Sequence, residues 1–138
     1  MLNWNQAMID EFHAKNGKGV GQFGDRLVLL TTRGARTGQE RTAPLMHHRD
    51  GERYVVVASK AGAPDNPAWY HNLKAHPVAR LEVGMESGTE TFDVRASEAE
   101  GEERERIWAD RVAIAPGFGD YQRKTTRQIP VMILERIG

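Results

Sequence analysis

The apolar residues of this chain fall into short runs, each bounded by glycine, proline or polar turn residues, which is typical of short β-strands. Asp50 and Gly51 separate two such runs as a tight hairpin turn, and another pair of runs turns near Ser87 and Gly88. Short links of this kind favour antiparallel neighbours. The pattern therefore predicts a small closed barrel with helices between its strands. The six predicted strands span residues 26–32, 42–49, 53–59, 78–84, 89–96 and 130–135.

A helix is predicted before the first strand, over residues 3–15. Met8, Ile9 and Phe12 share one face of this helix, and Gly17 ends it. We expect an N-terminal helical segment, residues 1–16, followed by a barrel, the whole of 1–138 forming one domain. The apolar face suits a lid over the barrel, and a weak membrane contact is the alternative.

Two further helices are predicted between strands. The first spans residues 66–75, with Asn66 as its N-cap. The second is an acidic helix over 98–113, which Trp108 and Val112 would anchor to the core.

The amino-acid composition excludes several kinds of functional site. A chain of 138 residues can bury one real core, and the absence of cysteine excludes disulfides, thiolate nucleophiles and cysteine-ligated metal. His47 and His48 are adjacent on a predicted strand and so face opposite sides, and no acidic cluster completes a site, so no metal is predicted. No apolar run is long enough to span a bilayer and no signal-peptide pattern begins the chain, so a cytoplasmic protein is expected.

Charge is segregated along the chain although the net charge is zero. Residues 26–80 hold nine basic residues against four acidic ones, and the rest of the chain holds ten against fifteen. A basic middle in a neutral protein predicts a local anionic ligand. A partner such as long nucleic acid is not expected, because proteins that bind it are more often basic overall.

A glycine-punctuated basic loop, within residues 31–44, follows the first predicted strand directly. Glycine lets a backbone approach a ligand closely, and guanidinium groups suit phosphate and carboxylate. Arg36, Arg41 and Lys60 are the main candidates for anion binding, with Lys60 at the end of the third strand. The alternative is a solvated hairpin that carries ordinary surface charges.

Three more residues could contact a bound molecule. Trp69 could support a planar cofactor and Asn72 could hydrogen-bond it, from a helix whose N-terminus adds partial positive charge. Trp69 could equally be a core anchor with Leu73. Tyr121 is a candidate hydrogen-bond donor to substrate or, alternatively, a packed surface tyrosine.

The order and spacing of several blocks resemble the deazaflavin (F420)-dependent nitroreductase and quinone reductase family. The blocks are the loop from Leu29 to Pro44, Arg49-Asp50-Gly51, residues 57–62, residues 66–73, residues 120–122 and Ile129-Pro130. The resemblance implies a mainly β fold with helices, a split β-barrel of the flavin-binding, pyridoxamine-phosphate-oxidase-like type.

The resemblance also implies an activity: hydride transfer from reduced coenzyme F420 to a small-molecule quinone, nitroaromatic or activated-alkene acceptor. A flavin-mononucleotide reductase on the same barrel and a non-catalytic F420-binding protein are the alternatives. The oligomeric state is left open.

Carried over by position, the resemblance assigns cofactor contacts and one catalytic hydroxyl, that of Tyr121. Arg36, Thr37, Arg41 and Lys60 would hold the phosphate and acidic tail, and Phe118 would pack on a ring. Ala35 is also among the assigned contacts, although it stands where relatives often carry a basic residue, and Ala115 and Phe118 stand where some carry tyrosine. The remaining assigned contacts are Thr42, Ala43, Pro44, Leu45, Met46, Val57, Ala58, Ser59, Ala68, Trp69, Tyr70, His71 and Asn72.

Overall fold

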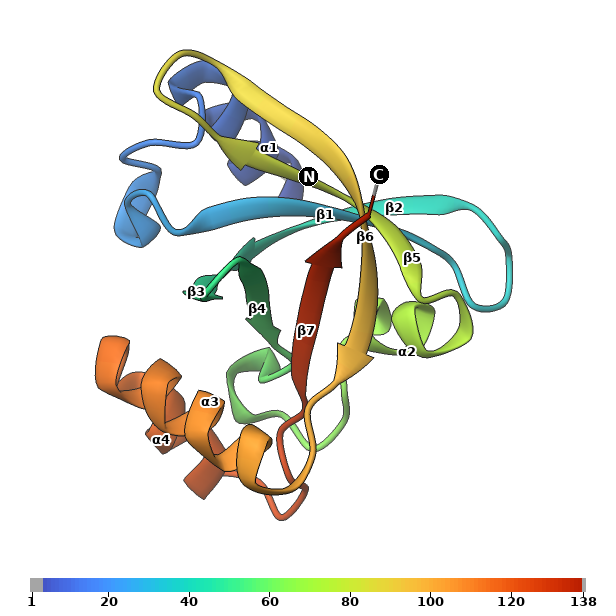
Figure 1. Cartoon of the computed structure of the whole chain (residues 1–138), viewed down its shortest axis with the longest axis vertical. Coiled ribbons are helices and arrows are strands. Elements are labelled where there is room, and N and C mark those ends of the chain that lie inside the picture. The colour runs from blue at the N-terminus through green and yellow to red at the C-terminus, as the bar shows by residue number, and fades with distance from the viewer. Residues whose placement is uncertain (1–3, 138) are drawn as a thin grey trace.

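The computed structural model describes residues 4–137, so the predictions that fall on residues 1–3 and 138 lie outside the described residues. Within that range, helices precede, interrupt and flank the strands of one curled sheet, as Figure 1 shows. The strands are β1 (Leu27–Arg33), β2 (Glu40–Met46), β3 (His48–Asp50), β4 (Arg53–Val57), β5 (Val78–Gly84), β6 (Thr89–Glu98) and β7 (Val131–Arg136). The helices are α1 (Trp4–Lys15), α2 (Ala68–Ala75), α3 (Gly101–Ile114) and α4 (Gly117–Arg123), with 3-10 turns η1 (Gly21–Phe23) and η2 (Lys60–Gly62).

All the strands join one antiparallel sheet in the order β2-β1-β5-β6-β7-β4-β3. The prediction of a single strand over 42–49 is wrong, because the chain changes partners at His47. The backbone N–H of His47 donates to the Arg26 carbonyl at 2.8 Å. Before it, Met46 pairs with Leu27 of β1, and after it His48 pairs with Val55 of β4.

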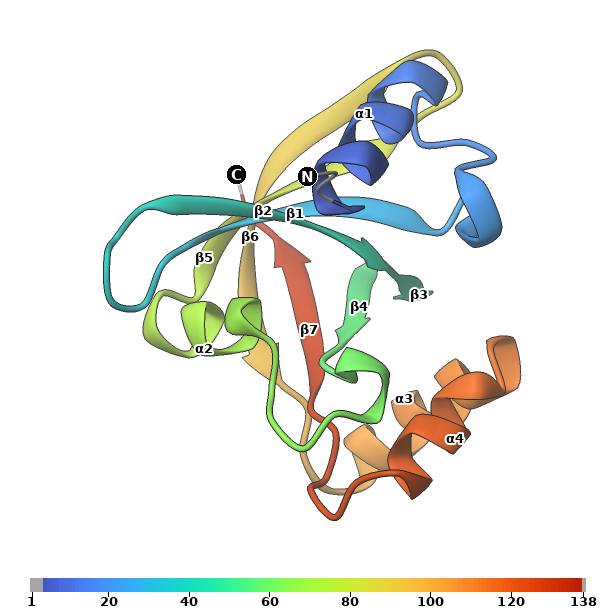
Figure 2. The ribbon, with the colours of Figure 1, turned by 180° about the vertical axis from the view of Figure 1, so that it is seen from behind.

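This change of partner explains why the barrel is split. The two edge strands of the sheet, β2 and β3, follow each other in the chain, so the sheet curls until its edges meet at His47 (Figures 1 and 2). The predicted closed ladder of six strands is therefore corrected to a ring that the covalent chain closes, with no β2–β3 hydrogen-bond ladder among the described residues.

The main core fills the inside of the curled sheet, with Leu30, Leu81 and Leu134 among its fully buried side chains. A second cluster lies between β4, β7 and α3, and a third lies under α1. In the third, Phe12 is fully buried and Met8 and Ile9 pack against the same cluster. The apolar face of α1 is thus used against β1, which leaves no comparable apolar face on the described part of this helix for a membrane. No helix among the described residues is long and apolar enough to cross a membrane.

Two local predictions are corrected. Asn66 does not cap α2, which begins at Ala68 with Pro67 in the N-cap position; the Asn66 Oδ1 instead accepts a hydrogen bond from Arg127 at 2.6 Å. The acidic helix, α3, is anchored by Ile107, which is fully buried, with partly buried Trp108 packed against the same cluster as predicted, whereas Val112 is not part of that cluster.

A charged cluster ties the β3–β4 hairpin to α3. Asp50 accepts hydrogen bonds from Arg53 of the hairpin and Arg106 of α3, the latter at 2.8 Å. The bonds from Arg106 and Arg53 hold the pKa of Asp50 well below its usual range. A carboxylate with a lowered pKa stabilises the fold above its unfolded pKa, and this contribution is lost as the pH falls through the folded value.

Asp50→Asn is therefore expected to lower the free energy of unfolding at pH 7 by about 1 kcal/mol, the upper range for partly exposed ion pairs. The deficit relative to wild type should shrink below about pH 4 and be smaller in 1 M salt. Urea unfolding at pH 7 and pH 3 measures both. A deficit that is equally large at pH 3 would mean that Asp50 acts through packing and not through its charge.

Candidate functional site

A cavity of about 510 Å³ opens where β2, the end of β4, α2 and α4 converge. Its volume lies within the range of about 300–1,000 Å³ that is typical of small-molecule sites. Most of its walls are apolar, and among its lining residues, all of them described, none is acidic. The lining residues are Phe23, Pro44, Leu45, Met46, Val57, Ser59, Lys60, Ala61, Pro67, Trp69, Arg111, Phe118 and Tyr121.

The loop after β4 brings Lys60 and Tyr121 to the same cavity. Lys60, Ala61 and Gly62 all have positive φ, at 46°, 54° and 84°. A Cβ on Gly62 would lie 2.8 Å from the carbonyl oxygen of Tyr121, so only glycine allows η2 to pack this closely on α4. Lys60 on one side and Tyr121 on the other are thereby fixed at the cavity wall.

The side chain of Arg127 fixes the backbone of the same loop through hydrogen bonds. Its guanidinium donates to the carbonyls of Ser59 at 2.8 Å, Ala63 at 2.9 Å and Ala58 at 3.1 Å, in addition to Asn66. One fork of N–H groups therefore fixes the backbone between β4 and α2. This explains why the Asn66 side chain is unavailable to α2.

Arg111 is the most deeply buried charged residue that lines the cavity, with 0% of its surface exposed. Its Nε donates to the His48 Nδ1 at 2.8 Å and its Nη2 donates to the Val55 carbonyl at 2.8 Å. The guanidinium lies 4.8 Å from the centroid of the Phe118 ring. Burial lowers the pKa of Arg111 to about 9, so the group remains a cation at pH 7.

Because the His48 Nδ1 accepts this hydrogen bond, its proton must sit on Nε2. His48 is 5% exposed, and burial followed by the Arg111 charge lowers its pKa to about 4. Among the described residues nothing pairs with the buried Nε2. The Arg111 charge is therefore balanced by neutral acceptors and not by a carboxylate.

Tyr121 and Phe118 form the α4 side of the cavity, with their rings edge to face at 5.3 Å. No hydrogen bond to the Tyr121 hydroxyl occurs among the described residues, whereas the Tyr70 hydroxyl donates to Glu98 at 2.7 Å. The Tyr121 hydroxyl is thus the phenol at the cavity that remains available to a ligand.

The predicted basic loop is docked on α2 by Asn72. The backbone N–H of Ala35 donates to the Asn72 Oδ1 at 3.0 Å, and the Asn72 Nδ2 donates to the Thr32 hydroxyl at 3.0 Å. The buried amide of Asn72 is therefore engaged with the loop itself. Arg36 is exposed and has no acidic partner in the described part of the chain.

Nine of the predicted contacts meet at the cavity: Pro44, Leu45, Met46, Val57, Ser59, Lys60, Trp69, Phe118 and Tyr121. Trp69 also packs in the core with Leu73, so its interpretation as a core anchor is confirmed, and its contact with a cofactor stays a prediction. Lys60 forms an ion pair with Asp65 at 3.0 Å.

The other predicted contacts lie outside the cavity lining. Thr42 shares a hydrogen bond of 2.8 Å with Thr31, and the Arg41 guanidinium donates to Gln39 at 2.9 Å. Ala43 and Ala58 belong to the main core, and Tyr70 turns to Glu98. Ala35, Arg36, Thr37, Ala68 and His71 are exposed beside α2 and the loop.

Sequence reasoning missed four lining residues: Phe23, Ala61, Pro67 and Arg111. The prediction of an acidic helix over 98–113 covers Arg111 but gives it no role at the site. The signal that could have identified it is the spacing Arg104, Ile107, Arg111, which places both arginines on the buried stripe of α3.

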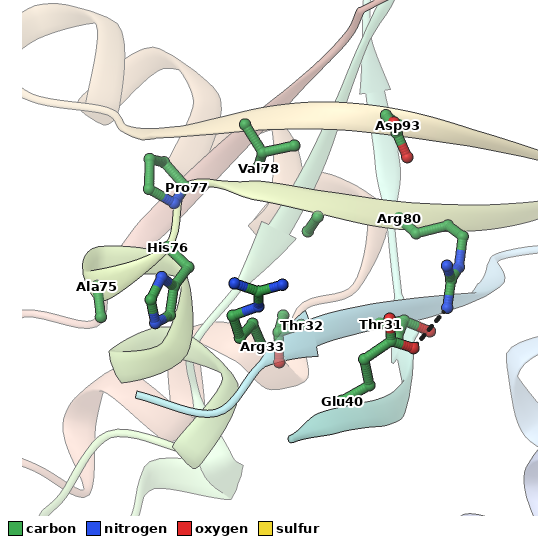
Figure 3. A pocket seen from close by; sticks show the side chains of 11 residues that line it. Thr31, Thr32, Arg33, Glu40, Ala75, His76, Pro77, Val78, Arg80 and Asp93 are labelled. Atoms are coloured by element: carbon green, nitrogen blue, oxygen red, sulfur yellow. Dashed lines mark hydrogen bonds and ion pairs between the residues drawn. The ribbon is translucent and has the colours of Figure 1, made fainter. Parts of the chain in front are cut away.

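A second hollow, of about 530 Å³, lies at the other end of β1 beside the C-terminus of α2 (Figure 3). Arg33 projects into it from β1, and Arg80 pairs with Glu40 at 2.8 Å. Glu40 and Asp93 also line it, so this hollow is of mixed charge. Among the described residues no group of three histidines or acids could hold a metal ion.

Comparison with known proteins identifies the family. The model of a family described as F420H(2)-dependent quinone reductase matches residues 4–136. An F420H(2)-dependent quinone reductase of Mycobacterium tuberculosis is 39% identical over 125 residues, which cover 84% of this chain and 81% of that protein.

Solved structures agree on the fold. An F420-H2 dependent reductase, FDR-A, superposes with a TM-score of 0.70 at 44% identity, over 80% of this chain and 94% of its own. A Listeria innocua protein described as a pyridoxamine 5'-phosphate oxidase superposes with a TM-score of 0.59 at 15% identity, over 82% of this chain and 85% of its own. The predicted split β-barrel of the pyridoxamine-phosphate-oxidase-like type is thereby confirmed. The chain belongs to the F420H(2)-dependent quinone reductase family.

Proposed function

We propose that this protein transfers a hydride from reduced coenzyme F420 to a quinone, and that the cavity between β2 and α4 is where the two molecules meet. The observation that carries the proposal is the cavity's chemistry: aromatic and aliphatic walls, two cations and no acid in its lining, in a member of this family. Apolar walls suit a flat ring system, and cations suit its anionic substituents.

The residues present fit the cofactor. Trp69, Pro44 and Phe118 would hold the ring, and Lys60 at the cavity rim would meet the phosphate. Exposed Arg36 and Arg41 on the loop would meet the acidic tail. The acid-free lining matters here, because a carboxylate at the wall would repel a ligand that carries several negative charges.

The cofactor, when bound, supplies the hydride and its electron pair. The chain's own residues orient the reactants and keep water out of an apolar cavity, which lowers the barrier without a dedicated acid. The Tyr121 hydroxyl lines the cavity and has no hydrogen-bond partner among the described residues, so it would donate a hydrogen bond to an acceptor oxygen that gains negative charge. The buried cation of Arg111, which packs on the Phe118 ring, favours the same charge.

The proposal is tested by titrating the protein with F420 and then with flavin mononucleotide, followed by turnover of reduced F420 with 2-methyl-1,4-naphthoquinone. We expect binding of F420 in the micromolar range or tighter and quinone-dependent oxidation of reduced F420. Tight flavin binding without F420 binding would replace the proposal with a flavin reductase. F420 binding without turnover of any quinone, nitro compound or enone would indicate a carrier.

Lys60→Ala is expected to weaken F420 binding by about 10- to 100-fold, which corresponds to roughly 1.5–3 kcal/mol for a hydrogen bond to a charged group. Isothermal titration calorimetry measures it. Lys74→Ala is the matched control, because Lys74 also pairs with an acid, Glu98 at 3.2 Å, but does not line the cavity. Equal affinity of wild type and Lys60→Ala would remove Lys60 from the cofactor site.

A further inference from the structure

A smaller cavity of about 320 Å³ adjoins the one described above. The two cavities share Phe23, Met46, Phe118 and Tyr121 in their walls, so they lie next to each other. The smaller cavity adds Arg26, at the start of β1, and its walls are more apolar than polar. It is therefore suited to a small aromatic molecule beside the larger site.

The smaller cavity carries an uncompensated positive charge. Arg26 is exposed, and no acid among the described residues forms an ion pair with it. Its neighbour Asp25 is engaged elsewhere, because its carboxylate accepts the Gly19 backbone N–H at 2.9 Å. Asp120, next to Tyr121 in the chain, is bonded to Arg123.

Arg111 adds to this charge from behind Phe118. Its guanidinium has only neutral acceptors, and the Arg26 charge is close enough to contribute to the lowering of the Arg111 pKa, after the larger effect of burial. Neither cavity has an aspartate or glutamate among its described lining residues. Arg26 in the smaller cavity and Arg111 in the adjoining larger one, with no acid in either lining, create a positive potential in this region.

We propose that the smaller cavity is an acceptor site that prefers quinones carrying a negative charge, such as a sulfonate, carboxylate or ionised hydroxyl, and that Arg26 is the residue that selects them. The inference rests on the proposed function and adds the charge class of its substrate. In the reaction the quinone gains the hydride with its electron pair and one proton from water, and so becomes the hydroquinone. Oxidation of the deazaflavin releases one proton to water, which balances the proton taken up by the quinone, and the anionic substituent is unchanged.

The test compares 1,4-naphthoquinone-2-sulfonate with neutral 2-methyl-1,4-naphthoquinone in wild type, Arg26→Gln and Arg26→Glu. The ratio of kcat/KM for the sulfonate to that for the methyl quinone cancels the intrinsic reactivities when variants are compared. We expect the ratio to fall by about three- to tenfold in Arg26→Gln, mostly through KM, and further in Arg26→Glu. Arg95→Gln makes the same charge change at an exposed position of β6 that lines neither cavity, and should leave the ratio at the wild-type value.

A binding measurement with ligands that do not react tests the anion site independently of turnover. Naphthalene-2-sulfonate and the neutral naphthalene-2-sulfonamide are titrated calorimetrically into the protein saturated with oxidised F420. The sulfonate should bind more tightly than the sulfonamide, and Arg26→Gln should weaken the binding of the sulfonate by about three- to tenfold. F420 affinity measured on the same variants shows whether Arg26 serves the cofactor.

Three outcomes would overturn the inference. These are an unchanged ratio in Arg26→Gln, an equal loss for both quinones, or a loss that follows weakened F420 binding. If wild type oxidises no reduced F420 with either quinone, the proposed function fails. In that case the calorimetric comparison of the two naphthalene ligands still tests the anion site. A preference for the sulfonate that depends on Arg26 supports an anion-selective site, and no preference refutes it.

Discussion

Replacing Arg111 with alanine is expected to lower the free energy of unfolding by about 3–5 kcal/mol. The substitution removes a fully buried side chain and leaves the His48 Nδ1 and the Val55 carbonyl without their donor. It also removes the cation that packs on Phe118. Because Arg111 joins α3 to β3, β4 and α4, we expect cooperative unfolding at a lower urea concentration with a similar m-value.

Two variants show which part of Arg111 matters. Arg111→Met keeps most of the volume but not the donors, so its loss should be intermediate. Arg123→Ala removes an arginine from an exposed position on α4 and should leave Tm nearly unchanged. If Arg111→Met is as stable as wild type, the hydrogen bonds contribute nothing net, and the cation is retained for the ligand and not for the fold.

Stability is expected to fall by on the order of 3 kcal/mol between pH 7 and pH 4 because of His48. The pKa of His48 is lowered to about 4 in the fold, below its unfolded value near 6.5. Unfolding therefore takes up a proton across this interval, so the stabilising contribution is complete above about pH 6.5 and is lost as the pH falls toward 4. A protonated His48 could no longer accept from Arg111.

Other titratable groups lie near His48, and their effect on stability must be separated from that of His48. Burial also lowers the pKa of His47, and the charges of Asp50 and Asp110 act on His48 from β3 and α3. His48→Gln keeps an oxygen that can accept from Arg111 but cannot titrate, so its stability should change less between pH 7 and pH 4. Urea unfolding at half-unit pH steps measures both proteins. If the free energy of unfolding depends on pH with the same slope in wild type and His48→Gln, then His48 is not the group responsible for the loss of stability.

The parts of this molecule that sequence could predict are those set by local pattern. β1, β5, β6 and β7 were expected from their apolar runs, and the turns at Gly51 and Gly88 both have the positive φ that glycine allows. The break at His47 could not be predicted, since nothing in 42–49 shows that the two halves of the run pair with different strands.

At the candidate site, too, residue types could be predicted from the sequence, whereas long-range contacts could not. Lys60 and Tyr121 were named from residue type and resemblance, and they lie at one cavity because of a contact between η2 and α4 that depends on Gly62. Arg111 was missed because a buried arginine held by a histidine and backbone carbonyls has the same local sequence as one in a solvated helix. Long-range acceptors decide its role, and sequence alone does not reveal them.

The position of β7 has a consequence for how this chain acquires its structure during synthesis. Of the strands in this sheet, β7 is synthesised after all the others, yet it is not an edge strand: it lies between β6 and β4 and pairs with both. Until it emerges, β4 and β6 lack a common neighbour, so the two parts of the barrel cannot be joined. We therefore expect nascent chains that end before residue 131 to form the β2-β1-β5-β6 part and the β3–β4 hairpin separately, and the complete sheet to form only after β7 has been synthesised.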